Sequence, residues 1–149
     1  VIKDTISGID GERFSFLIID LDDLKYINDN YGHAQGDRAI KAIADTMRES
    51  FRENDTIGRY GGDEFVALLN RVPSTECLNV ILDRFIDKVK ANRAGENDEY
   101  PITCSVGVYT GKRGTESFDE VFNRADIALY NAKRSGKCSY CCYSDEMHK

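Results

Sequence analysis

Apolar residues occur in short blocks along the chain, and the spacing within each block predicts the element that it forms. Residues 13–20 (RFSFLIID) are rich in β-forming residues and apolar on both faces, which predicts a buried strand that ends at Asp20. Residues 22–31 predict a short helix. A second helix is predicted from Asp37, as its N-cap, because apolar side chains follow at positions 40, 43, 44, 47 and 51.

A Gly-Gly pair marks the middle of the chain. Residues 55–60 and 63–70 have the composition of strands, and Gly61-Gly62 between them predicts a hairpin whose tight turn needs positive φ. The remaining expected elements are a helix over 76–91, a polar loop over 93–99, a strand over 101–109, a helix that the capping box Ser117-x-x-Glu120 opens and that ends near Arg134, and a last strand over 138–143. This order combines crossovers with a central hairpin, so it predicts an α/β (α+β) fold with a mixed sheet covered by helices.

Composition narrows the class of protein. A length of 149 residues with 41% apolar residues suits one domain over residues 1–149 with a sizeable core. The net charge of -6 argues against a general binder of nucleic acid or anionic membranes. No apolar run approaches the roughly 20 residues that cross a bilayer, and no signal peptide is visible. The chain begins at Val1, so we expect a piece of a longer, multidomain protein.

The cysteines give no disulfide framework. Their number, five, is odd, and three of them lie close together near the end, at positions 138, 141 and 142. Cys138-x-x-Cys141 has the spacing of a metal site, but no second cysteine pair follows, and His33 and His148 are the only histidines. We therefore expect reduced thiols in a cytoplasmic domain rather than a structural zinc site.

Carboxylates gather where two apolar strands begin or end. Asp20 ends the first predicted strand and is followed by Asp22 and Asp23, which could instead complement the dipole at a helix N-terminus. Asp63 and Glu64 follow the two glycines directly. If the hairpin lies beside the first strand, three of these carboxylates converge and repel one another, which a bound divalent cation would relieve. Oxygen ligands suit Mg²⁺ or Mn²⁺, and the glycines would let a phosphate or sugar approach the backbone.

Lysines and one amide extend this chemistry. Lys25, Lys133 and Lys137 could supply positive charge to a polyphosphate, although lysines on helices are commonly surface residues. Asn28 with Asp37 could together contact the hydrogen-bonding edge of guanine. Taken separately, these two are a turn residue and a helix cap.

With these residues the sequence resembles the GGDEF family, the diguanylate cyclases of bacteria. The resemblance runs from residue 13 to about residue 143. It rests on the intact signature at residues 61–65 with Arg59-Tyr60 before it, on IIDLDDLKYINDNYGHAQGD at 18–37 and on RADIALYNAK at 124–133. The family fold implied is a five-stranded mixed sheet surrounded by helices, similar to nucleotidyl cyclases and polymerase palms.

The resemblance also implies a reaction. Two GTP molecules would be joined into cyclic di-GMP with release of two pyrophosphates, the 3′-hydroxyl of each attacking the α-phosphate of the other. Two Mg²⁺ or Mn²⁺ ions per active site would be held by the carboxylates of Asp20 and Asp63 and by the backbone carbonyl of Leu21. Glu64 would lie at the metals and assist deprotonation of the 3′-hydroxyl.

The remaining family positions imply how the nucleotide is bound. Lys133 and Lys137 would hold the β- and γ-phosphates with Lys25 nearby, and Asn28 and Asp37 would select guanine. Each subunit would hold one GTP, so the active form would be a homodimer, with no nucleic acid and no direct membrane contact by this domain.

One further match is regulatory. Arg52-Glu53-Asn54-Asp55 resembles the family's RxxD inhibitory site, and Asp55 lies six residues before Gly61. An arginine there can bind an anion through two parallel hydrogen bonds. We therefore expect cyclic di-GMP to inhibit the enzyme noncompetitively at Arg52 and Asp55.

Two segments depart from the family pattern. Residues 4–9 resemble the start of the family's usual opening segment, but the short stretch between Gly8 and Asp20 leaves no room for its long first helix. Lys137-Cys138 stands where the family mostly has Arg-Asn, and lysine keeps the charge but loses the bidentate fork of arginine.

Two other functions compete with catalysis. A degenerate relative could sense GTP or cyclic di-GMP and pass the signal to an attached domain, and a purely structural or dimerisation domain could bind neither. The presence of Asp20, Asp63 and Glu64 favours the enzyme, because clustered carboxylates without a ligand would only cost stability.

Overall fold

A five-stranded mixed sheet forms the frame of the molecule. The computed structural model describes residues 13–52, 55–70, 72–112, 114 and 116–149, so residues 4–9, with the family-like opening segment, lie outside the described part. The strand order is β2-β3-β1-β6-β7, all neighbours being antiparallel except β6 and β7. The strands are β1 (Arg13–Leu21), β2 (Thr56–Arg59), β3 (Glu64–Asn70), β6 (Cys104–Lys112) and β7 (Tyr140–Cys142). The expected mixed sheet of five strands is confirmed.

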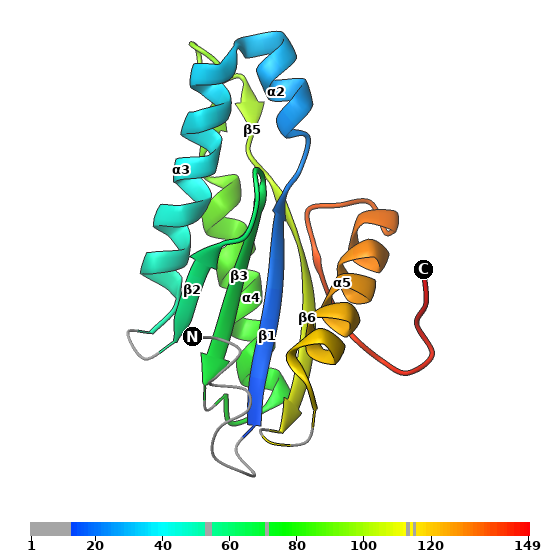
Figure 1. Cartoon of the computed structure of the whole chain (residues 1–149). Coiled ribbons are helices and arrows are strands. Elements are labelled where there is room, and N and C mark those ends of the chain that lie inside the picture. The colour runs from blue at the N-terminus through cyan, green and yellow to red at the C-terminus, as the bar shows by residue number, and fades with distance from the viewer. Residues whose placement is uncertain (1–12, 53–54, 71, 113, 115) are drawn as a thin grey trace.

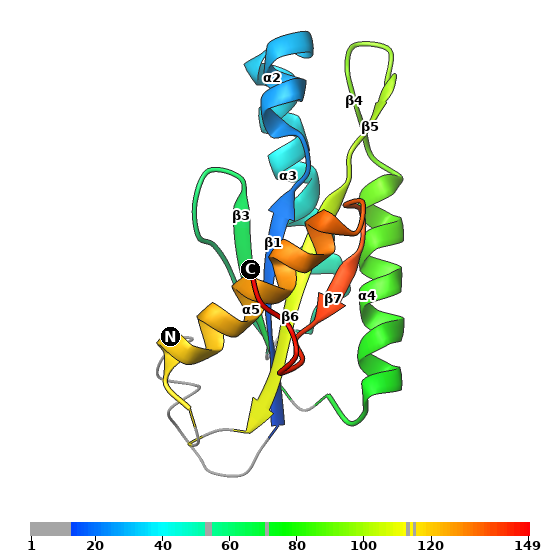
Figure 2. The same cartoon turned by 90° about the vertical axis from the view of Figure 1, so that its right-hand side faces the viewer.

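The central strand β1 divides the core into two layers, which explains why it is apolar on both faces. Phe14, Phe16 and Ile18 pack with α5 (Phe118–Arg134) on one face of the sheet. The alternate residues, Leu17, Ile19 and Leu21, pack with α3 (His33–Ser50) and α4 (Thr75–Lys90) on the other. Figures 1 and 2 show α5 on the opposite side of the sheet from α3 and α4, while α2 (Leu24–Tyr31) lies beyond the end of β1.

Gly107 lets α5 approach the sheet closely. A Cβ at this position of β6 would lie 2.2 Å from the carbonyl oxygen of Ala125 and 2.3 Å from the backbone nitrogen of Leu129. Real Cβ atoms do not approach backbone atoms so closely, so a side chain here would push α5 away from the sheet. Because α5 carries Lys133, this glycine also bears on the site described below.

Serine side chains cap the N-termini of two helices, α4 and α5, and the sequence predicted the cap of α5. Ser117 Oγ accepts a hydrogen bond from the Glu120 backbone nitrogen at 3.2 Å, which confirms the expected start of α5. Ser74 caps α4 in the same way, accepting from the Cys77 backbone nitrogen at 3.1 Å. Each cap satisfies a donor that a helix N-terminus leaves free.

The predicted N-cap of the second helix is wrong. α3 begins at His33, and the residue before it is Gly32, which alone separates α2 from α3. Gly32 has a φ of 92°, a conformation that side chains disfavour, and this permits the abrupt change of direction. Asp37 therefore lies inside α3, one turn beyond its start.

The expected polar loop over 93–99 is also different. The chain forms a second, two-stranded sheet here, from β4 (Arg93–Ala94) and β5 (Tyr100–Pro101). The main strand β6 consequently begins at Cys104, later than expected, and runs on to Lys112. Strands of two residues carry no periodic pattern that a sequence analysis can detect.

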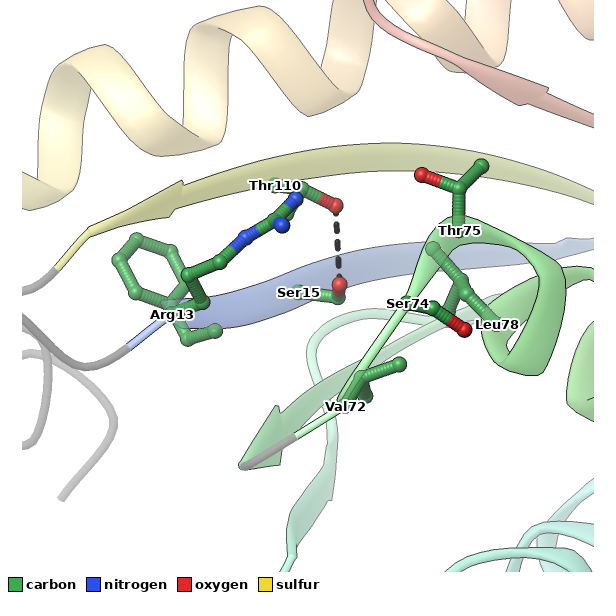
Figure 3. Close-up of a pocket in the computed structure, with 8 residues that line it drawn as sticks. Arg13, Ser15, Val72, Ser74, Thr75, Leu78 and Thr110 are labelled. Atoms are coloured by element: carbon green, nitrogen blue, oxygen red, sulfur yellow. Dashed lines mark hydrogen bonds between the residues drawn. The ribbon is translucent and has the colours of Figure 1, made fainter.

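A small cavity lies at the end of the sheet where β1 begins. Figure 3 shows Arg13, Ser15, Ser74 and Thr110 around it, with Ser15 and Thr110 joined by a hydrogen bond of 2.9 Å between their hydroxyl oxygens. Its volume of about 10 Å³ is at most enough for one water molecule. This cavity is therefore no substrate site.

Two of the expectations concern membrane-spanning helices and disulfide bonds. None of the described helices is long and apolar enough to span a bilayer. All five cysteines carry free thiols, and that of Cys104 is buried.

Candidate active site

Three carboxylates come together at the end of β1. The antiparallel register pairs Asp20 with Glu64, and the Leu21 backbone nitrogen donates to the Asp63 carbonyl oxygen at 2.9 Å. Pairing with β3 therefore brings the signature acids, which begin that strand, beside the acid that lies near the end of β1. Sequence reasoning made this convergence conditional on the two strands being neighbours, and they are.

Asp20 is the most perturbed of these acids. Its side chain is buried, and Lys133 on α5 donates a hydrogen bond to Oδ2. Burial, with smaller contributions from the charges of Asp63 and Glu64, raises the pKa of Asp20 to about 6 although Lys133 opposes the shift. Burial, followed by the charges of Asp126 and Asp63, also raises the pKa of Glu64. The pocket thus disfavours negative charge in the absence of a cation.

A divalent cation fits the chemistry of these donors. Asp20 Oδ1 is buried without a hydrogen-bond partner among the described residues, and a buried carboxylate oxygen left in this way is costly. Hard oxygen donors of this kind suit Mg²⁺ or Mn²⁺. Among the described residues no three His, Cys, Asp or Glu side chains are arranged as a finished metal site, and the ammonium group of Lys133 lies against Asp20.

The signature loop between β2 and β3 is held by its own residues. Arg59 donates from Nε to the Gly61 carbonyl oxygen at 3.0 Å and from Nη2 to the Gly62 carbonyl oxygen at 2.8 Å. The Tyr60 backbone nitrogen donates to the Glu64 carbonyl oxygen at 2.8 Å, and the Tyr60 ring lies 5.0 Å from that of Phe122 on α5. These contacts tie the loop both to its own hairpin and to the helix that carries Lys133.

The expected positive φ of the two glycines is wrong. Neither Gly61 nor Gly62 has a positive φ, because the chain turns over four residues between β2 and β3 rather than over a tight pair. A Cβ at either position would meet nothing within 4 Å. The loop therefore exposes bare backbone, which stays consistent with close approach of a phosphate or sugar.

Asp22 does not serve to complement the dipole at the N-terminus of α2, which the sequence analysis gave as an alternative. It is 4% exposed and accepts three hydrogen bonds, from Ser105 Oγ at 2.7 Å, Thr103 Oγ1 at 2.8 Å and the Cys138 backbone nitrogen at 3.0 Å. It thus joins the end of β1 to the start of β6 and to the loop that follows α5. Nothing in the sequence distinguished this buried acid from its neighbours, because its partners lie more than 80 positions away.

Asp23 and Lys137 form an ion pair at the rim of the site. Asp23 precedes α2 in a left-handed conformation, with a φ of 61°, and makes no side-chain cap to the helix. Its Oδ1 accepts from Lys137 Nζ at 2.9 Å, an interaction that raises the pKa of that lysine. Lys133 and Lys137 therefore both lie at the β1 end, while Lys25 is exposed on α2, one turn from Asn28.

The two residues expected to contact guanine lie on consecutive helices. Asn28 is half-buried on α2 and Asp37 is exposed on α3. Gly36 between them was missed: a Cβ there would lie 1.8 Å from Asn28 Oδ1, so only glycine lets the Asn28 side chain lie against α3. A glycine within a helical pattern is the signal that could have identified this close contact.

The expected inhibitory site lies at the opposite end of α3. Asp55 accepts from the Arg52 backbone nitrogen at 3.0 Å and from the Asn70 backbone nitrogen at 2.9 Å. Its carboxylate therefore links the segment between α3 and β2 to the last residue of β3. Residues 53 and 54 lie outside the described part. A depression of about 290 Å³ is lined by the exposed Arg52, by Asp55 and by Arg84 of α4, which the sequence analysis did not single out.

Known proteins are similar to this chain in sequence and in fold. The family model described as "Diguanylate cyclase, GGDEF domain" matches residues 4–139. Over 129 residues the chain is 40% identical to the diguanylate cyclase DgcP of Pseudomonas aeruginosa. The aligned region covers 86% of this chain and 19% of DgcP. The chain thus spans about a fifth of the length of that relative.

Solved structures have the same fold. The active GGEEF domain of a diguanylate cyclase from Vibrio cholerae superposes with a TM-score of 0.81 at 28% identity, covering 90% of this chain and 85% of that one. The GGDEF domain of DgcB from Caulobacter crescentus, solved in complex with c-di-GMP, gives a TM-score of 0.79 at 27% identity, covering 89% and 78%. These matches support the fold of a five-stranded mixed sheet with helices.

Proposed function

The chain belongs to the GGDEF family, and we propose that it is a single catalytic domain that condenses two GTP molecules into cyclic di-GMP. Each 3′-hydroxyl attacks the α-phosphate of the other GTP, its proton leaves, and one pyrophosphate departs for each bond formed. The observation that carries the proposal is the buried, unpartnered Oδ1 of Asp20 beside Asp63 and Glu64. A domain without a cationic ligand would gain nothing from this arrangement.

The acids form the metal-binding part of the site. Asp20 and Asp63 through their carboxylates, Leu21 through its carbonyl oxygen and Glu64 would hold two Mg²⁺ or Mn²⁺ ions, which supply charge neutralisation and activation of the attacking oxygen when bound. Glu64 has a raised pKa and begins β3 opposite Asp20, so it is suited to accept the proton of the 3′-hydroxyl.

The lysines orient the leaving group. Lys133 pairs with Asp20 and Lys137 with Asp23, so each ammonium group is already held at the rim of the carboxylate cluster. We assign both to the β- and γ-phosphates, with the exposed Lys25 as a supporting charge. Because these are lysines, each provides a point charge without the fork geometry of arginine.

We assign guanine selection to the junction of α2 and α3 at Gly32, which we call the elbow. Asn28 and Asp37 together offer an amide and a carboxylate to the N1–H, the N2 amine and the acceptor edge of guanine. Adenine has neither the N1–H nor the N2 amine, so the Asp37 carboxylate would remain unpaired against it. Two such domains, each with one GTP, would face each other as a homodimer in the cytoplasm, where GTP is available.

Product inhibition is part of the same proposal. The exposed Arg52 and the nearby Arg84 line one depression, and guanidinium groups bind phosphates through paired hydrogen bonds. Cyclic di-GMP bound there would inhibit noncompetitively. An Arg52→Ala variant with unaltered product binding would contradict this assignment.

The test is direct synthesis. The purified domain is incubated at high concentration with GTP and Mg²⁺, and cyclic di-GMP is measured by chromatography and mass. We expect product from the wild type and a loss of at least about a thousandfold in Asp63→Ala. Asp119→Ala, which removes an exposed acid in the first turn of α5, is the matched control and should retain activity.

Binding measurements separate the remaining outcomes. Turnover by Asp63→Ala equal to the wild type would remove the metal-ligand assignment. GTP binding without turnover in a dimeric sample would favour the sensor function over the enzyme. Absence of GTP binding by a folded wild type would contradict both.

A further inference from the structure

The small hairpin of β4 and β5 has no part in the site as described so far. We call residues 93–101 the arm. Figure 2 shows that it extends beyond the main sheet toward the end of the molecule where α2 lies, and Figure 1 shows β5 beside α2 and α3. The arm is braced internally, because Arg93 donates to the carbonyl oxygens of Asp98 and Glu99 at 2.5 and 3.3 Å.

On one side the arm contacts the start of α3. The Gly95 backbone nitrogen donates to Gln35 Oε1 at 2.9 Å, and Arg38 forms an ion pair with Asp98 at 3.0 Å. Both side chains of the ion pair are more than half exposed, so that pair contributes little on its own. The contacted positions 35 and 38 flank the pair 36–37, which holds the close contact with Asn28 and the proposed guanine carboxylate.

On the other side the arm contacts α2. The Tyr100 ring lies 4.9 Å from that of Tyr26 and 5.9 Å from that of Tyr31, which are the distances of favourable aromatic pairs. The Tyr100 hydroxyl also donates to Asp23 Oδ2 at 3.4 Å, just before α2 begins. One hairpin thus contacts both helices of the elbow.

The junction of α2 and α3 has one direct contact of its own, because the Asn28 side chain lies against Gly36 of α3. α2 and α3 are joined by Gly32 alone, and a glycine in a φ range open to many conformations does not determine the angle between two helices. The proposed base contacts lie on different helices, Asn28 on α2 and Asp37 on α3. Their separation therefore depends on the direct contact of Asn28 with Gly36 and on what packs against both helices.

We propose that the arm clamps α2 to α3 and sets the separation of Asn28 and Asp37, so that Gln35 and Tyr100 are positioning residues for selection of the purine base. The inference rests on the proposed function, since it assigns guanine to that pair. Loosening the clamp costs guanine recognition, while phosphate contacts at Lys133 and Lys137 remain.

The experiment compares GTP and ATP binding to the wild type, Tyr100→Ala and Tyr100→Phe by calorimetry. We expect Tyr100→Ala to weaken GTP binding about tenfold, the scale of lost aromatic pairs, and to leave ATP binding unchanged. Tyr100→Phe keeps the rings in contact and should keep the preference for GTP. Tyr130→Ala, which removes an exposed tyrosine of α5, is the matched control.

A second variant guards against a general loss of structure. Gln35→Met removes the acceptor for the Gly95 nitrogen at nearly constant size, and we expect a loss of about threefold in the GTP-to-ATP preference. Equal weakening of both nucleotides in Tyr100→Ala, or an unchanged preference in both variants, would overturn the positioning role. A wild type that binds GTP and ATP equally would instead overturn the proposed function, and the inference with it.

Discussion

Two polar clusters on the α5 side of the sheet differ in how completely their groups are paired. The site cluster consists of Asp20, Asp63, Glu64 and Lys133, and one buried oxygen of Asp20 has no partner among the described residues. The second, which we call the tyrosine cluster, consists of Tyr109 on β6, Arg124 on α5 and Glu116, which lies two residues before α5 begins.

In the tyrosine cluster each group contacts the other two. The Tyr109 hydroxyl oxygen lies 2.5 Å from both carboxylate oxygens of Glu116, and Arg124 donates to that hydroxyl at 3.1 Å and pairs with Glu116. The guanidinium carbon of Arg124 also lies 5.3 Å from the centre of the Tyr109 ring. Burial and the bond to Glu116 raise the pKa of Tyr109 to about 12.

The comparison separates groups that stabilise the fold from groups that we propose bind a ligand. A fully paired, half-buried cluster stabilises the protein, whereas a carboxylate buried with an unpaired oxygen costs free energy that a bound cation would recover. Asp20 and Tyr109 are about 13 Å apart along the sheet by the usual rise per residue, because Tyr109 pairs with Phe16, four positions before Asp20. Substitutions in the two clusters should accordingly change stability in opposite directions.

The largest loss of stability should come from Asp22, a fully paired acid two positions from Asp20. Asp22→Ala leaves the hydroxyls of Thr103 and Ser105 and the Cys138 nitrogen without their acceptor. We expect the free energy of unfolding to fall by about 3 kcal/mol, measured by urea denaturation. Asp22→Asn, which keeps one acceptor oxygen, should lose less. A change below about 1 kcal/mol would place Asp22 with the unpaired acids.

A smaller loss is expected in the tyrosine cluster. Glu116→Gln weakens the charge-assisted bonds to Tyr109 and Arg124, so we expect a loss of about 1–2 kcal/mol in the free energy of unfolding. Synthesis of cyclic di-GMP should remain near the wild-type rate, because no residue of this cluster belongs to the proposed site. A large loss of synthesis at unchanged stability would break the distinction between the two clusters.

The same cluster has a defined dependence on pH. Because the folded protein raises the pKa of Tyr109 from 10.0 to about 12, its contribution to stability is complete below pH 10 and is lost as pH rises through about 12. Ultraviolet titration of tyrosinate should therefore show one phenol that ionises nearer pH 10 in Glu116→Gln than in the wild type. Identical titration curves for the two proteins would contradict the assigned pairing.

The smallest effect on stability, and of opposite sign, is expected at Asp20. Asp20→Asn removes a buried charge with an unpaired oxygen, so without metal the free energy of unfolding should stay equal to that of the wild type or rise by about 1 kcal/mol. Synthesis should nevertheless be lost. Thermal unfolding without divalent cations, followed by the synthesis assay, measures both, and a destabilisation like that of Asp22→Ala would remove the contrast.

Much of the frame could be predicted from local pattern. The doubly apolar block at 13–20, the stripe over 76–91 and the serine before α5 each specify a strand or helix through burial or capping that involves nearby residues. The predicted cap at Asp37 was wrong because a single glycine, Gly32, was sufficient to start α3. The expected turn at Gly61-Gly62 had the right position but the wrong conformation.

By itself the sequence determined the residue types of the site and the strands that carry them, because both depend on short-range order along the chain. Only the tertiary structure decided which acids are paired, since the partners of Asp22 and Asp20 come from β6, α5 and the loop after it. It likewise decided that the arm contacts α3 and the residue before α2, through hydrogen bonds between residues 60 and 77 positions apart. Pairing across such separations depends on how the whole sheet assembles, and no local pattern encodes it.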